Sequence, residues 1–256
     1  MKDLTIKEIG AKLALAGRLK ASPLCVYGSE TVPDYAIPIK KINRCIANAI
    51  FSLSFDQNIN AVYIGNDTLE GCCPGGQAWF GYKTFLPMLK YFLSTGSDNY
   101  RNGAAEFLIA TPDLAEKQLN SIKKIKPLGK HIVIRKCDDI VEEDFDVKEI
   151  ICFGLSEQIR NLCSLAYFRP EEGFNILIPW GPSCASFVTY PAGMVEKGIK
   201  DSIIIGPTDP TGNNWFPQDY LSMGIPFECA KRMANDLGDS FIIKRSEIAY
   251  PIKRKT

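Results

Sequence analysis

Two short segments of the chain place cysteine beside glycine and proline. The first is CCPGG at residues 72–76 and the second is GPSC at residues 181–184. If a helix starts at each turn, its unpaired N–H groups and the positive end of its dipole favour the ionised thiol. A thiolate is the nucleophilic and metal-binding form of cysteine, so both segments are candidate sites of thiol chemistry.

The adjacent cysteines receive different interpretations. We expect Cys73 to be chemically active, because it alone stands directly before Pro-Gly-Gly, and we expect Cys72 to be mainly local structure. The glycines at 75, 76 and 181 would allow a ligand or another backbone segment to approach closely. The same turns could instead hold an anion without any help from sulfur.

Several familiar arrangements do not fit these segments. Adjacent cysteines lack the C-x-x-C spacing of a zinc knuckle, and PGGQAWFG matches neither a P-loop nor a dinucleotide fingerprint. The one histidine, His131, stands at the start of a predicted strand, which disfavours nucleophiles that need a histidine base. For each single cysteine, burial as a small core residue is the alternative interpretation.

The composition of the 256 residues is globular, with 46% hydrophobic and 23% charged residues and a formal net charge of +1. Nucleic acid and membranes are not expected partners, because both require a concentrated basic surface. The first twenty residues mix charge into every turn and predict an amphipathic helix rather than a signal peptide. We expect a soluble, cytoplasmic protein whose nine scattered cysteines are mostly reduced.

Helices and strands are predicted to alternate along the chain. Apolar residues at helical spacing predict helices at 4–19, about 40–53, 84–94, 111–122, 156–167 and 226–237. Runs of β-branched residues predict strands at 24–28, 60–65, 130–136, 148–154, 174–180 and 201–207. The alternation indicates an α/β or α+β fold with one mixed sheet flanked by helices.

We expect a single domain over residues 1–256, with an N-terminal helix at about 3–20 packed on it. Residues 60–82 and 174–193 repeat one order, namely a strand, glycine and cysteine, then small and aromatic residues. This echo suggests two weakly duplicated halves that meet near residue 126, and a shared local design is the alternative.

Three motifs in order resemble the family catalogued as domain of unknown function 169. They are NRCIANAI at 43–50, CPGGQAWFG at 73–81 and PSCASFVTYP at 182–191, and the segments 153–168 and 219–227 support them. The resemblance covers about residues 24–241 and implies an archaeal or anaerobic bacterial source with no assigned activity. The first strand departs from the family pattern, because LCVYGSETVP lacks the family's basic residue.

The resemblance places the family's cysteines at Cys45, Cys73 and Cys184. Three converging thiolates would form a ligand set for a metal ion, an iron–sulfur cluster or another soft cofactor. The remaining residues of such a pocket would be Gly75, Gly76, Trp79, Trp180, Gly181 and Ser183. The alternative is a non-catalytic protein whose glycine-rich turns bind a small metabolite or an anion. Both hypotheses make a small molecule or a metal the partner.

Overall fold

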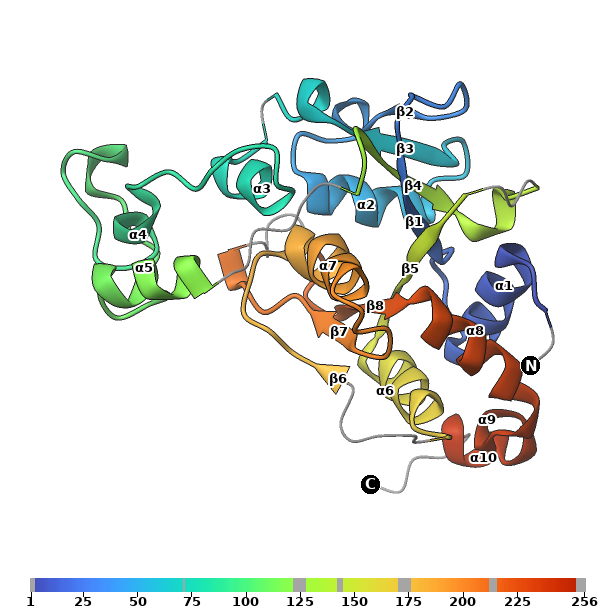
Figure 1. Cartoon of the computed structure of the whole chain (residues 1–256). Coiled ribbons are helices and arrows are strands. Elements are labelled where there is room, and N and C mark those ends of the chain that lie inside the picture. The colour runs from blue at the N-terminus through green and yellow to red at the C-terminus, as the bar shows by residue number, and fades with distance from the viewer. Residues whose placement is uncertain are drawn as a thin grey trace.

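The fold is built around one mixed sheet (Figure 1). The computed structural model describes residues 3–70, 72–121, 128–141, 145–169, 176–211 and 216–251. In this part of the chain, eight strands lie in the order β2-β3-β4-β1-β5-β8-β7-β6. Their bounds are β1 (Leu24–Ser29), β2 (Ile37–Pro38), β3 (Ala61–Ile64), β4 (His131–Lys136), β5 (Val147–Leu155), β6 (Ile176–Leu177), β7 (Ile203–Gly206) and β8 (Tyr220–Pro226). The predicted class, a mixed sheet flanked by helices, is confirmed.

Helices cover both faces of this sheet. Their bounds are α1 (Ile6–Gly17), α2 (Ile46–Phe55), α3 (Pro74–Trp79), α4 (Leu89–Phe92), α5 (Pro112–Ser121), α6 (Ser156–Ala166), α7 (Tyr190–Glu196), α8 (Phe227–Asp236), α9 (Phe241–Lys244) and α10 (Ser246–Ala249). The apolar sides of α1, α6 and α8 share one core cluster, and α2 and α7 lie over the other face. Within the described ranges, no helix is long and apolar enough to cross a membrane.

Side chains of the central strand β1 contribute to the core on both faces of the sheet. Leu24 and Val26 join the core under α2, whereas Cys25 and Tyr27 join the core under α1. Successive side chains of a strand point to opposite faces, so both sets are buried only because helices cover both sides. This is why the strand reads as a continuous apolar run in the sequence.

The two halves of the sheet have the same topology. Read from each edge inward, the order is β2-β3-β4-β1 in one half and β6-β7-β8-β5 in the other. In both halves the edge strand pairs parallel to its neighbour, and the remaining pairs are antiparallel. β1 and β5 pair antiparallel at the centre, so an approximate two-fold axis relates the halves.

The equivalent segments of the two halves differ from those that the sequence echo matches. The sequence echo matches residues 60–82 with 174–193, but β3 lies second from its edge, whereas β6 is an edge strand whose counterpart is β2. Ile37 of β2 and Ile176 of β6 each stand 8 residues before a cysteine, Cys45 and Cys184 respectively. These two cysteines therefore occupy equivalent positions. The expected boundary near residue 126 falls outside the described residues.

The sequence does not predict β2 or β8, although all six predicted strands are present at least in part. β2 is two residues long and contains proline, so it carries almost no strand signal. β8 contains Ser222 and Gly224, which interrupt its apolar pattern. The helix predicted at about 40–53 begins only at Ile46, because residues 39–41 form a separate 3₁₀ turn.

Helix α1 begins with a capping box and packs closely on the strand ends. The Thr5 hydroxyl accepts a hydrogen bond from the Glu8 backbone N–H at 3.2 Å, and the Glu8 carboxylate accepts one from the Thr5 N–H at 2.8 Å. On its buried side, Gly10 lies against Cys137 so closely that a methyl group at residue 10 would overlap the Cys137 Cβ.

Replacing Gly10 by alanine should therefore destabilise the fold, although alanine is the better helix former. We expect the free energy of unfolding in urea to fall by about 1–3 kcal/mol, the usual cost of an extra methyl group in a tightly packed core. Gly238→Ala is the matched control, because no atom lies within 4 Å of the added Cβ. A Gly10→Ala protein as stable as wild type would contradict this packing.

Candidate functional site

A cavity of about 520 Å³ lies where five segments of the chain meet. These are residues 43–47 around the start of α2, 73–79 around α3, 89–119, 180–184 before α7, and 209–211 after β7. The third segment belongs to the helical excursion, residues 81–121, which leaves the sheet after β3 and carries α4 and α5 (Figure 1). Parts of both halves and the excursion thus enclose one space.

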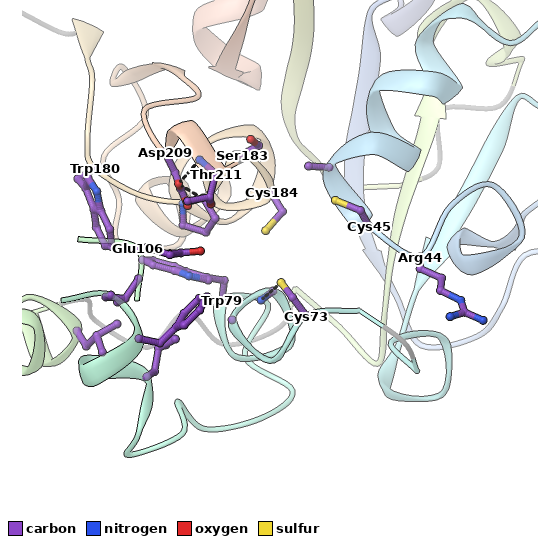
Figure 2. Close-up of a pocket in the computed structure, with 18 of the residues that line it drawn as sticks. Arg44, Cys45, Cys73, Trp79, Glu106, Trp180, Ser183, Cys184, Asp209 and Thr211 are labelled. Atoms are coloured by element: carbon purple, nitrogen blue, oxygen red, sulfur yellow. Dashed lines mark hydrogen bonds between the residues drawn. The ribbon is translucent and has the colours of Figure 1, made fainter. Parts of the chain in front are cut away.

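The structure brings Cys45, Cys73 and Cys184 to this one cavity (Figure 2). Each cysteine lies at the start of a helix: Cys45 directly precedes α2, Cys73 directly precedes α3, and Cys184 lies in the first helical turn before the π-helical segment that continues into α7. The sequence placed Cys45 inside a helix, and the later start of α2 corrects that position. Unpaired N–H groups at helix starts favour negative charge, so the cavity suits a thiolate.

Gly76 allows the sulfur atoms to gather. A Cβ atom at this position would lie 2.9 Å from the Sγ of Cys72, 3.4 Å from that of Cys73 and 3.8 Å from that of Cys184. A side chain at residue 76 would therefore displace the Cys72 sulfur and press against those of Cys73 and Cys184. The Cys72 sulfur lies in the same thiol cluster, formed by Cys72, Cys73 and Cys184, but Cys72 does not line the cavity, so the expectation that it is mainly local structure stays a prediction.

A hydrogen bond within the thiol cluster determines which sulfur ionises. The Cys72 thiol donates to the Cys73 sulfur, and the Gly76 backbone N–H donates to the same sulfur at 3.2 Å. With the positive charge of Arg101, these bonds lower the pKa of Cys73 to about 6, although burial opposes the change. The lowered pKa favours the thiolate form at neutral pH, and the residue as a whole is exposed to solvent although its sulfur is partly buried.

The neighbouring thiols keep their protons in the neutral range. The hydrogen bond to Cys73 raises the pKa of Cys72, and burial raises it further. Burial also raises the pKa of Cys184 and of Cys45, and the negative charge of Cys73 adds to both shifts. One thiolate among neutral thiols avoids the repulsion that several thiolates would suffer.

Aromatic and aliphatic side chains form the cavity walls. Trp79 and Trp180, both expected there from the sequence, line the cavity together with Phe92 and Tyr100. The Tyr190 hydroxyl donates to the Trp180 carbonyl oxygen at 2.7 Å and so fixes the segment that carries this tryptophan. The cavity therefore offers an apolar space beside the thiolate.

The remaining predicted residues divide into two groups. Gly75 and Ser183 line the cavity, and the buried Ser183 hydroxyl has no hydrogen-bond partner among the described residues. Gly181 is not part of the cavity wall. A Cβ there would lie 2.9 Å from the Tyr190 ring, so this glycine makes room for the ring rather than for a ligand. His131 is a buried residue of β4, as its strand position predicted.

The sequence did not predict that two charged residues of the excursion belong to the cavity. Arg101 and Glu106 line the cavity, and the signal around them, YRNGAAEF, reads only as a turn. Burial, the neighbouring Asp209 and the thiolate raise the pKa of Glu106 to about 7, although Arg101 opposes this shift. Arg44, the sequence neighbour of Cys45, also lines the cavity, but its side chain is exposed and points away from the sulfurs (Figure 2).

A family model matches most of the chain. The model of the domain of unknown function 169 family (DUF169), described as uncharacterised ArCR, matches residues 12–236. The chain belongs to the DUF169 family. Neither a curated protein nor a solved structure matches the chain. The suspected resemblance is thus confirmed for most of the chain, and Cys45, Cys73 and Cys184 all lie within the part that matches the DUF169 model.

The hydrogen bond from Cys72 predicts how the reactivity of Cys73 depends on pH. Alkylation of Cys73 by iodoacetamide, followed by peptide mass spectrometry, should rise with pH around a midpoint of about 6. Cys72→Ala removes the donor, so the midpoint should move up toward that of an ordinary thiol, and the rate at pH 7 should fall several-fold. Cys72→Ser keeps a donor and is the matched control. An unchanged midpoint in Cys72→Ala would contradict the assigned hydrogen bond.

Proposed function

We propose that this protein binds a small molecule with a soft or electrophilic centre in the thiol-lined cavity, with the Cys73 thiolate as the anchor. The observation that carries the proposal is the gathering of the Cys72, Cys73 and Cys184 sulfurs around Gly76, beside an apolar cavity of about 520 Å³. This volume lies within the range of small-molecule sites, which combine apolar walls with a few polar groups. A permanent thiolate without such a role would be an oxidation hazard on an exposed surface.

The other two sulfurs of the thiol cluster support a soft ligand over a purely polar one. Cys72 and Cys184 stand beside Cys73 with protonated thiols, so a thiophilic atom bound to Cys73 could reach a second sulfur. Soft centres prefer sulfur donors, whereas a hard anion would gain nothing from them. Binding through glycine turns alone, the alternative from the sequence, leaves the gathered thiols unexplained.

A metal ion or cluster held by Cys45, Cys73 and Cys184 has less support. Among the described residues, no group of three or more His, Cys, Asp or Glu side chains could hold a metal ion. Metal analysis of protein purified without oxygen separates the two ideas, because one tightly bound equivalent would favour the metal.

Phenylarsine oxide tests the proposed function directly. Its arsenic forms bonds to two thiol sulfurs and releases water, while the phenyl group would enter the aromatic cavity. We expect one equivalent to bind per chain and to block alkylation of Cys73, and Cys73→Ser should lose this binding. Cys163→Ser is the control, because Cys163 is a half-buried thiol of α6 outside the cavity. Equal binding by Cys73→Ser and wild type would overturn the proposal.

A further inference from the structure

The least explained feature of the cavity is the conformation of Arg101. Arg101, Asn102 and Gly103 have consecutive positive φ angles of 51°, 55° and 80°. The left-handed region is unfavourable for residues other than glycine, and such strain persists only where the surrounding structure enforces it. Here the strained turn directs an arginine into the cavity.

Two aromatic rings hold the guanidinium group in place. The Arg101 Cζ lies 4.3 Å from the centre of the Phe92 ring and 5.6 Å from that of Tyr100. Contacts of this kind use the flat face of the guanidinium and leave its in-plane N–H groups available. Among the described residues, Arg101 has no ion pair and no side-chain hydrogen bond. An arginine fixed in this way has unused donors beside the cavity.

The acidic side chains of the cavity do not consume this charge. The Asp209 carboxylate accepts hydrogen bonds from the Thr211 N–H at 2.9 Å and from the Thr211 hydroxyl at 2.7 Å, so it is turned toward its own loop. Glu106 is part-buried, and its raised pKa means that a large fraction carries a proton near neutral pH. Arg101 is therefore a fixed positive charge at the cavity wall, whereas the other arginine of the lining, Arg44, is exposed and points away from the sulfurs.

We propose that the ligand is a small organic acid, whose carboxylate pairs with the in-plane donors of Arg101 while its apolar body fills the aromatic cavity and its soft or electrophilic centre faces Cys73. This inference rests on the proposed function and adds the chemical class of the ligand. A planar guanidinium and a carboxylate match in a two-pronged pair, which also fixes orientation. The alternative use of the aromatic walls, a cage for a cation, conflicts with Arg101, which already occupies the rings of Phe92 and Tyr100.

Iodoacetate and iodoacetamide test this proposal, because they differ chiefly in the carboxylate. In each reaction the thiolate sulfur forms a bond to carbon as iodide leaves with the electron pair of the C–I bond. We expect the ratio of the iodoacetate rate to the iodoacetamide rate at Cys73 to exceed the ratio for glutathione by about tenfold, the size of a charge-assisted pair. The ratio cancels the thiolate fraction, so the influence of Arg101 on Cys73 ionisation drops out.

Substitutions of arginine then test whether Arg101 causes the raised ratio of the two alkylation rates. Arg101→Gln should lower the ratio to that of glutathione, and Arg101→Lys, which keeps the charge but not the planar fork, should give an intermediate ratio. Arg245→Gln is the matched control and should keep the wild-type ratio, because Arg245 is an exposed arginine outside the cavity. As a measurement that needs no variant, phenylacetate should protect Cys73 of the wild-type protein from iodoacetamide better than phenylacetamide does.

The two proposals fail in different ways. If iodoacetamide does not alkylate Cys73 rapidly at pH 7, the proposed thiolate site is wrong. If iodoacetamide reacts rapidly but the ratio equals that of glutathione, only the assignment of an organic acid is wrong. A ratio below that of glutathione, together with better protection by a phenylalkyl trimethylammonium ion than by phenylacetate, would instead favour a cationic ligand.

Discussion

The antiparallel pairing of β1 with β5 is the contact on which the rest of the structure depends. It joins two halves of equal topology into one sheet and sets the approximate two-fold axis between them. Because this axis is perpendicular to the sheet, α2 and α7 lie on the same face. Cys45 and Cys184, which precede these helical regions at equivalent positions, therefore line one cavity instead of lying at opposite ends of the molecule.

The functional asymmetry comes from a single connection. In the second half, the chain runs from Gly206 at the end of β7 to Tyr220 at the start of β8. In the first half, the equivalent connection runs from Ile64 at the end of β3 to His131 at the start of β4. The longer connection supplies Cys73, the aromatic walls of the excursion and Arg101. The symmetric core thus provides the floor with two protonated thiols, and the connection between β3 and β4 provides the Cys73 thiolate, Arg101 and Glu106.

Sequence patterns predicted much of the fold and part of the site. Buried strands such as β4 and β5 could be predicted because their β-branched runs are continuous, and Cys73 because it precedes Pro-Gly-Gly. The equivalence of Cys45 and Cys184 could not be predicted, since it depends on the two-residue strands β2 and β6, whose pairing is decided by long-range contacts.

The same limit applies to the charged residues of the cavity. Arg101 and Glu106 lie in a polar turn of ordinary composition, and only tertiary packing turns them toward the thiolate. Arg44 shows the converse. It precedes a cysteine in the sequence, yet its side chain points away from the sulfur atoms. For side chains outside regular elements, neighbourhood in the sequence says little about direction in space.

In the proposed function, the hydrogen bond between Cys72 and Cys73 would make the two sulfurs react in succession. Once Cys73 forms a covalent or coordinate bond, its sulfur loses the negative charge that raises the pKa of Cys72. The Cys72 thiol then loses its acceptor as well, so its proton is released more easily and a second thiolate becomes available beside the first. Capture by one sulfur thereby primes its neighbour, and a ligand with two open valences would be held more firmly after the first bond than before it. The Cys72 proton therefore delays the second bond until the first bond has formed at Cys73.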